Sequence, residues 1–172
     1  MKDICERIKI TPARREDLYA LAALIHDSWR SVYHGIVAQD YLNSMSLELR
    51  HERFAQGFDE GASHFYQMLL DELLIGAAVF GKSHTEGFEQ DGEISAIYLD
   101  KDFIGHGYGH LFFSHVERLL QKEGYAHLVL SLLPENVRAF RFYQAHGYRE
   151  SANSTLDIGG KSYPVVIMRK QL

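Results

Sequence analysis

One stretch of the sequence, residues 93–123, restricts the possible folds of this chain more than any other. Residues 93–99 are strand-like, glycines follow at positions 105, 107 and 109, and residues 111–120 form an amphipathic run with helical spacing. Glycines at alternate positions let a ligand lie close to the backbone, and the N-terminus of the next helix favours an anion. The stretch predicts a strand, a turn and a helix around a phosphate-type group, although such turns are common and do not identify a ligand alone.

The size and charge of the chain limit its class. With 172 residues, of which 46% are hydrophobic, the chain suits a single domain, 1–172, with one sizeable core. Its net charge is −5, and it has neither a long block of like charges nor a basic stripe. This balance argues against nucleic acid as a partner and mildly favours a cationic small substrate.

The N-terminal region bears on the compartment. Cys5 is the only cysteine, which excludes an internal disulfide and fits a reducing compartment. The first residues are too charged for a signal peptide, and no apolar run approaches the length that spans a membrane. We therefore expect a cytoplasmic protein without a membrane partner.

Hydrophobic periodicity predicts the element order β-α-α-β-β-β-α-β-α-β-β. Ser46 is the expected N-cap of the second helix, residues 40–42 and 71–72 are expected turns, and 81–91 a loop. The order predicts a mixed α/β sheet with helices on its faces. Strands are expected at 6–10, 64–70, 73–80, 93–99, 127–133, 148–157 and 161–169, and helices at 15–31, 46–58, 111–120 and 135–146.

A second motif occupies residues 134–148. It contains Asn136, the pairs Ala139-Phe140 and Phe142-Tyr143, and a closing Gly147-Tyr148. Together with the glycine turn, this motif resembles the GNAT superfamily of N-acetyltransferases. The resemblance covers most of the second half of the chain, whereas residues 1–90 resemble the family only in element order. It implies an α/β (α+β) acyl-CoA N-acyltransferase fold, with a mostly antiparallel sheet of about seven strands flanked by about four helices.

The resemblance also implies acetyl-CoA as the cofactor, with CoA as the product and no metal. Where the family usually has Arg or Gln before the first glycine, this chain has Ile104. Because backbone amides contribute most of the pyrophosphate binding in such a turn, we expect a less firmly oriented turn that still binds the ligand. The implied cofactor-binding residues are Ile97, Tyr98, Leu99, Ile104, Gly105, His106, Gly107, Tyr108, Gly109, His110, Asn136, Phe140 and Tyr143.

The spacing of residues in the second motif gives a physical reason for a binding groove on this helix. Asn136, Phe140 and Tyr143 lie at i, i+4 and i+7, which is one face of a helix, so an amide and a phenol can point into one groove. An isolated aromatic stripe of this kind is more often simply core. The glycine turn and Asn136 favour the groove here.

Acyl transfer from a thioester to an amine requires a neutral amine, a polarised carbonyl and a proton for the departing thiolate. Glu93 is the carboxylate nearest in sequence to the groove and is the candidate base, directly or through water; the alternative is a solvated strand-end glutamate. A backbone N–H near Leu99 is expected to stabilise the oxyanion. Tyr143 is the candidate general acid because a phenol and a thiol have comparable intrinsic pKa values.

Two further groups of residues bear on binding. Trp29, Tyr33 and His34, at the end of the first expected helix, are candidates for the substrate pocket, with packing under the following loop as the alternative. His106 and His110 have the i, i+4 spacing of a ligand pair, but no third ligand accompanies them in a zinc motif, so we expect no metal site.

These observations predict an N-acetyltransferase that moves an acetyl group from acetyl-CoA to a primary amine by direct transfer in a ternary complex. The amine-bearing acceptor, a small molecule or a protein, is not identified by the sequence. The alternative is a non-catalytic acyl-CoA-binding sensor or interaction module. Residues 161–169, expected to form an exposed edge strand, suggest a possible homodimer.

Overall fold

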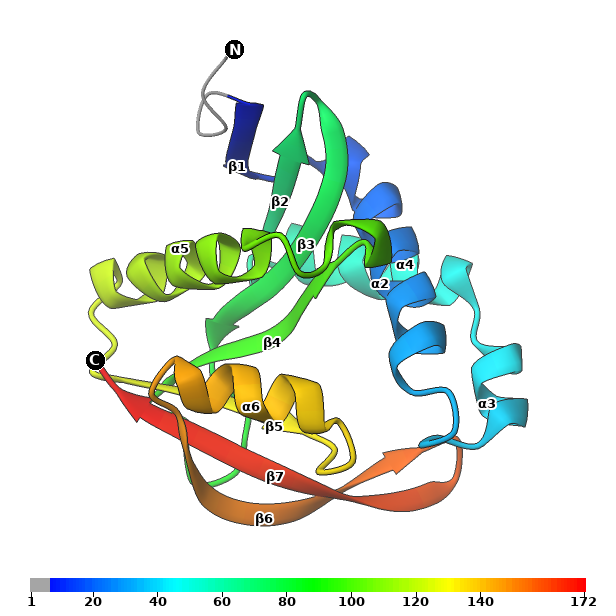
Figure 1. Cartoon of the computed structure of the whole chain (residues 1–172), viewed down its shortest axis with the longest axis vertical. Helices are drawn as coiled ribbons and strands as arrows, with labels where there is room; N and C mark the ends of the chain where they lie inside the picture. Colours follow the sequence, from blue (N-terminus) through cyan, green and yellow to red (C-terminus); the bar gives the residue numbers. More distant parts are fainter. Residues whose placement is uncertain (1–6) are drawn as a thin grey trace.

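Seven strands form the framework of the chain, of which the computed structural model describes residues 7–172. They form one sheet in the order β1-β2-β3-β4-β5-β7-β6 (Figure 1). Neighbouring strands are antiparallel, except that β4 and β5 are parallel. The prediction of a mixed, mostly antiparallel sheet is confirmed. The strands are β1 (Ile8–Pro12), β2 (His64–Leu70), β3 (Leu73–Lys82), β4 (Gly92–Leu99), β5 (His127–Leu132), β6 (Arg149–Ile158) and β7 (Lys161–Gln171).

Helices cover both faces of this sheet. α2 and α4 pack on one face, whereas α5 and α6 pack on the other (Figure 1). No helix in the described part of the chain is long and apolar enough to cross a membrane. The helices are η1 (Arg15–Asp17), α2 (Leu18–Val32), α3 (Gln39–Ser44), α4 (Leu47–Asp59), η2 (Lys101–Phe103), α5 (Tyr108–Lys122) and α6 (Val137–Ala145).

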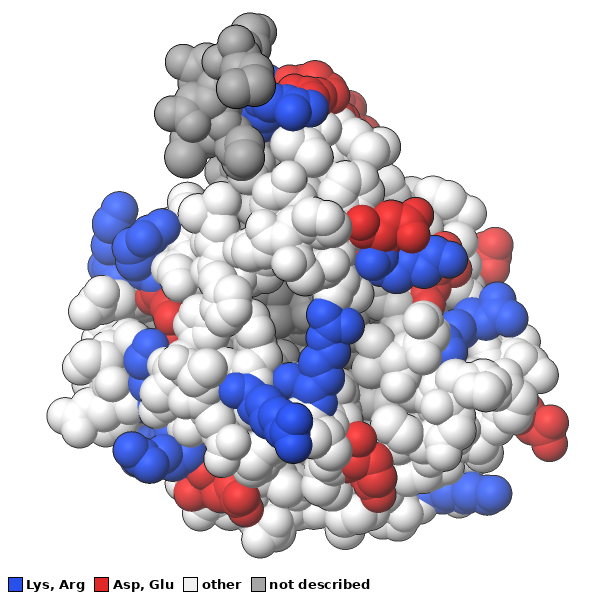
Figure 2. All heavy atoms as spheres, viewed as in Figure 1, with Lys and Arg blue, Asp and Glu red and all other residues white. Residues whose placement is uncertain are grey.

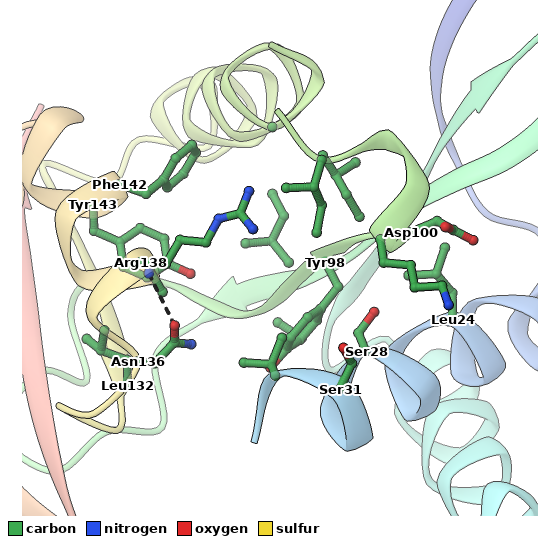
Figure 3. A pocket seen from close by; sticks show the side chains of 18 of the residues that line it. Leu24, Ser28, Ser31, Tyr98, Asp100, Leu132, Asn136, Arg138, Phe142 and Tyr143 are labelled. Carbon is green, nitrogen blue, oxygen red and sulfur yellow. Dashed lines mark hydrogen bonds between the residues drawn. The ribbon is translucent and has the colours of Figure 1, made fainter. Parts of the chain in front are cut away.

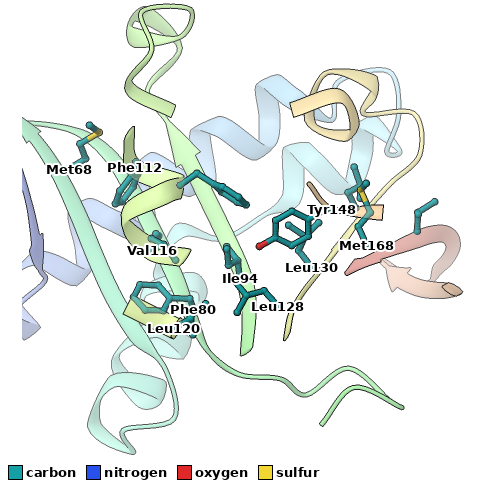
Figure 4. Packing of buried hydrophobic residues seen from close by; sticks show 14 of the residues in the cluster. Met68, Phe80, Ile94, Phe112, Val116, Leu120, Leu128, Leu130, Tyr148 and Met168 are labelled. Atoms are coloured by element: carbon teal, nitrogen blue, oxygen red, sulfur yellow. The ribbon is translucent and has the colours of Figure 1, made fainter. Parts of the chain in front are cut away.

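Alternation along β3 separates the two cores. Phe80 packs with Phe112 of α5, whereas the preceding residue, Val79, packs with Leu21 of α2 on the opposite face. Figure 4 shows the first of these clusters, in which side chains from α5 meet those of β4 and β5. Strand β4 and helix α5, which lie within or overlap residues 93–123, therefore also contribute to the main core.

Two local predictions are confirmed by the backbone. Oγ of Ser46 accepts a hydrogen bond from the backbone N–H of Leu49 at 3.1 Å, as an N-cap does. Asp71 and Glu72 have φ values of 48° and 67°, the left-handed conformation that a two-residue hairpin turn requires.

Three predictions about elements need correction or limitation. Residues 39–44 form the short helix α3, not a turn, because Leu42 is fully buried in a cluster with Tyr33. Residues 161–169 are not an edge strand, because β7 lies between β5 and β6; the edge is β6. The first strand begins at Ile8, and Cys5 with residue 6 lies outside the described residues.

Candidate active site

The sheet splits between β4 and β5. Their parallel ladder consists of only two pairs, Gly92 with Leu128 and Glu93 with Val129. The antiparallel register of β3 and β4 also shifts, so that Ser95 stands opposite no β3 residue. Beyond these positions β4 and β5 diverge, and the edge of β4 that faces β5 is left without a strand partner.

A cavity of about 970 Å³ fills this split. The molecular surface is hollowed at this place, and Lys or Arg side chains border the hollow (Figure 2). Strands β4 and β5, the glycine turn, and the helices α2, α5 and α6 all contribute to its walls (Figure 3). Ile97, Tyr98 and Leu99 are among the lining residues, so the predicted strand end does meet the cavity.

The glycine turn forms one end of the cavity. Gly105 and Gly107 have φ values of 91° and 84°, and Gly107 is the N-cap of α5. A Cβ built on either glycine would meet no heavy atom within 4 Å, so the space over the turn is open. Positive φ, open space and a helix N-terminus together fit a pyrophosphate group.

Not every residue of the turn faces the cavity. Ile104, Gly109 and His110 line it with the two glycines, whereas His106 and Tyr108 do not. His110 lies close to His146, with 2.8 Å between Nδ1 of His110 and Nε2 of His146. His110 therefore contacts the end of α6, and the i, i+4 spacing of His106 and His110 does not bring both histidines to the cavity.

α6 supplies the opposite wall. Oδ1 of Asn136 accepts a hydrogen bond from the backbone N–H of Ala139 at 3.2 Å, so Asn136 caps the helix while it lines the cavity. Phe140, a predicted cofactor-binding residue, packs against the main core and does not line the cavity. Phe142 lies there instead, beside Tyr143.

Three phenols gather in the cavity. Tyr33 from α2, Tyr98 from β4 and Tyr143 from α6 all line it. Burial and, to a smaller extent, the phenol of Tyr33 raise the pKa of Tyr143, and the same two causes raise the pKa of Tyr98. Tyr143 therefore stays protonated at neutral pH, and its hydroxyl, which points into the cavity in Figure 3, remains a hydrogen-bond donor.

Of the three predicted substrate residues, Tyr33 alone lines the cavity. Trp29 packs against Tyr33 with 4.4 Å between ring centroids, and Arg50 lies 5.8 Å over the indole. His34 is exposed at the end of α2 and does not line the cavity. Trp29 thus fits the packing alternative better than the pocket role, whereas the exposed His34 fits neither.

Glu93 does not line the cavity either. Its Oε2 accepts hydrogen bonds from Oγ of Ser83 at 2.9 Å, the backbone N–H of His84 at 2.9 Å and Oγ1 of Thr85 at 3.2 Å. These contacts hold the loop after β3 to the start of β4. The structure thus gives Glu93 an anchoring role and does not bring it together with Tyr143.

Several polar lining residues were missed in the sequence. Asp27, Ser28 and Ser31 face the cavity from α2, and Asp100 and Asp102 from the segment after β4. Polar residues on an amphipathic helix usually mark its solvent face, so nothing local distinguished these three on α2. Their position depends on the split of the sheet, which is not a local feature. Lys101, Arg138 and Arg141 are the cationic lining residues.

Comparison with known proteins agrees with this geometry. A model of the Acetyltransferase (GNAT) family matches residues 21–148. The chain is 28% identical over 153 residues to an uncharacterized N-acetyltransferase, YuaI, of Bacillus subtilis, covering 89% of this chain and 87% of that protein. It is 26% identical over 149 residues to a spermidine N(1)-acetyltransferase of Thermoplasma acidophilum, covering 83% and 88%.

A solved structure supports the fold independently. The PaiA N-acetyltransferase of Thermoplasma acidophilum, in complex with coenzyme A, superposes with a TM-score of 0.76 at 22% identity, over 96% of this chain and 99% of that one. Since the family model spans most of the chain, this protein belongs to the GNAT family of acetyltransferases and is an N-acetyltransferase enzyme.

Proposed function

We propose that the chain transfers an acetyl group from acetyl-CoA directly to a primary amine while both substrates occupy the cavity. The observation that carries the proposal is the meeting, in one cavity, of the open edge of β4, the glycine turn and Tyr143. Acetyl-CoA supplies the thioester. No nucleophilic cysteine is among the lining residues of the described chain, which supports transfer without a covalent enzyme intermediate.

Each wall has a role in this proposal. The turn at Gly105 and Gly107 binds the pyrophosphate through backbone N–H groups. The open edge of β4, at residues 97–99, pairs with the pantetheine arm, and a backbone N–H there stabilises the developing oxyanion. Tyr143 donates its proton, or a hydrogen bond, to the departing sulfur.

The acceptor must lose a proton before it attacks. Because Glu93 is held by three donors outside the lining, we propose that water takes this proton within the cavity, which makes Glu93 a positioning residue for the loop. In this proposal water, and not the carboxylate of Glu93, is the base, and the fourth prediction of the Discussion tests it.

The cavity lining includes carboxylates that can attract a cationic acceptor. Asp27 from α2 and Asp102 from η2 line the cavity, and no ion pair with a described Lys or Arg engages either carboxylate within 4 Å. A second cationic group on the acceptor would be attracted there. The similarity to a spermidine N(1)-acetyltransferase supports the same class, so we propose a small diamine or polyamine acceptor.

The test is product analysis. Purified protein is incubated with acetyl-CoA and, separately, with spermidine, a short monoamine and a lysine-containing peptide, and both CoA release and acetylated product are measured. We expect acetylated spermidine at the highest kcat/KM. Acetylation of the peptide alone would overturn the acceptor class, and tight acetyl-CoA binding without any acetylated amine would favour a non-catalytic acyl-CoA-binding module.

A further inference from the structure

The split between β4 and β5 closes at the innermost end of the cavity. Glu93 and Val129 form the last pair of the ladder, so the next residue of each strand, Ile94 on β4 and Leu130 on β5, stands at the apex of the split. Both side chains line the cavity, and both belong to the main hydrophobic core (Figure 4). The proposed function assigns no role to this apex.

The apex is apolar on the face of the sheet that α6 covers. Ile94 and Leu130 are 5% and 2% exposed, and Leu132, the next residue of β5 on this face, lines the cavity and is buried as well. Tyr143 packs against the same cluster. Carbon atoms of a ligand are removed from water at such a surface, whereas a charged group would lose its hydration there without gaining a partner.

Polar groups line the cavity on the opposite face of the sheet. Ser131 lies between Leu130 and Leu132 on β5, so strand alternation directs its side chain to that face. Ser28 of α2 lines the cavity from the same face, together with the apolar Leu24 (Figure 3). The half of the cavity next to α2 therefore offers hydrogen-bond partners to an amine, and the apex does not.

The two residues at the apex are held firmly by the sheet. Ile94 pairs with Phe80 of β3, and Leu130 pairs with Met168 of β7. All four side chains are buried in one cluster. Closely packed cores resist the insertion of further methylene groups, so the apex cannot retreat easily from a ligand that is too long.

We propose that Ile94 and Leu130 form the end wall of an acyl pocket and restrict the enzyme to short acyl groups, acetyl and propionyl, so that butyryl and longer chains are rejected. This inference rests on the proposed binding of acetyl-CoA along β4. There the pyrophosphate lies at the glycine turn and the developing oxyanion lies at the open edge of β4. The alkyl chain is the remaining apolar part of the acyl group, and the apex is apolar surface in the same cluster as Tyr143.

The experiment compares the binding of acetyl-CoA and butyryl-CoA in the absence of an amine. Leu130→Ala removes an isopropyl group from the wall, which leaves room for the ethyl extension of butyryl. By calorimetric titration, wild type should bind acetyl-CoA about tenfold or more tightly than butyryl-CoA, and Leu130→Ala should reduce this ratio to about twofold or less. Equal affinities in wild type, or an unchanged ratio in Leu130→Ala, would overturn the inference.

The matched control is Leu128→Ala. Leu128 lies on the same face of β5 and is fully buried in the same cluster, but it does not line the cavity. Both variants remove the same atoms from the core, so both should lose stability, and only Leu130→Ala should change the acyl preference. A change of the same size in Leu128→Ala would indicate general loosening of the core and would overturn the role of the wall.

Milder variants keep the test valid if Leu130→Ala does not fold. Leu130→Val and Ile94→Val each remove one methylene group and suit a strand, so they should shift the ratio in the same direction by a smaller factor. An unchanged ratio in both would overturn the inference.

A competition assay gives a second readout. Spermidine is incubated with an equimolar mixture of acetyl-CoA and butyryl-CoA, and mass spectrometry measures the ratio of butyrylated to acetylated product. Unfolded molecules do not affect this ratio, which should rise from wild type to Leu130→Val to Leu130→Ala. Binding of acetyl-CoA with the same acyl preference in every wall variant would overturn the inference alone. Failure of folded wild type to bind either thioester would overturn the proposed function, and the inference with it.

Discussion

Arg169 and Asp91 form a bidentate ion pair across β5, at the closed end of the split. Nε of Arg169 donates to Oδ2 of Asp91 at 2.6 Å, and Nη2 donates to Oδ1 at 2.9 Å. Arg169 stands opposite Val129 of β5, and Val129 stands opposite Glu93 of β4, so the pair joins β7 to the residue before β4. It holds the strands together where their ladder is only two pairs long.

The first prediction concerns this ion pair. Arg169→Met should lower the free energy of unfolding by about 3 kcal/mol, because the carboxylate of Asp91, only 4% exposed, loses its partner. Chemical denaturation measures the change. The control is Arg15→Met, which breaks the exposed pair with Asp59 and should cost much less, because water screens that pair. Equal costs for the two variants would mean that the Arg169 pair does not hold the split.

The second prediction concerns the glycine turn. Saturating acetyl-CoA should stabilise the wild type by about 2.7 kcal/mol at a hundredfold excess over Kd, seen as a rise in Tm. Gly107→Val should abolish most of that rise, because valine disfavours a φ of 84° and places methyl groups over the turn. Gly87→Val imposes the same strain at a φ of 83° away from the cavity and should keep the rise. Loss of the rise in both variants would indicate general damage.

The third prediction concerns Tyr143. Tyr143→Phe keeps the ring that packs against Phe113 but removes the donor, so kcat should fall by roughly 10²- to 10⁴-fold while acetyl-CoA affinity is unchanged. Because burial raises the pKa of Tyr143, the phenol stays protonated as pH rises, and wild-type kcat should show no loss from this group up to about pH 10. A variant within a few-fold of wild type, with chemistry rate-limiting, would make Tyr143 a packing residue.

The fourth prediction separates the two roles of Glu93. Glu93→Gln weakens three hydrogen bonds to an ionised acceptor, so the free energy of unfolding should fall by about 1–3 kcal/mol, with kcat changed less than about threefold at saturating substrates. Denaturation and steady-state kinetics are measured on one preparation. A large loss of kcat at low pH that is recovered at high pH, without a loss of stability, would restore Glu93 as the base.

Local patterns predicted the elements well because their signals lie within a few residues. The hairpin at Asp71 and Glu72, the cap at Ser46 and the glycine turn at Gly105 and Gly107 were visible in this way. The motif Asn136 to Tyr143 was assigned to the correct helix, but one face was drawn through Phe140, whereas the cavity is reached by Phe142. A spacing of four residues shows which side chains share a face of a helix, but it does not show which face of the helix meets the cavity.

Non-local geometry accounts for the rest. Glu93 belongs to β4, the strand whose later residues line the cavity. The split between β4 and β5 opens only beyond Glu93, so its carboxylate binds the loop of residues 83–85 instead of facing the cavity. In the sequence, Asp27 and Ser31 have the positions of residues on the solvent face of an amphipathic helix. Because β4 and β5 separate, this face of α2 borders the cavity instead. The order in which β6 and β7 join the sheet likewise depends on tertiary pairing and could not be read locally.

The last prediction tests the carboxylate of Asp27 in the cavity lining. Asp27 is exposed on α2 and lines the cavity, so it can attract the distal ammonium group of a diamine without contacting the reacting carbonyl. Asp27→Asn should raise KM for spermidine about three- to tenfold with little change in kcat, and added salt should narrow the difference from wild type.

Two controls separate this attraction from other effects. Glu150→Gln removes the same charge from exposed β6, away from the cavity, and should leave KM unchanged. A short monoamine lacks the distal charge, so its KM should be similar with wild type and Asp27→Asn. If KM for spermidine and for the monoamine rise together in Asp27→Asn, the aspartate shapes the cavity instead of recognising a second charge, and the diamine acceptor class loses its structural support.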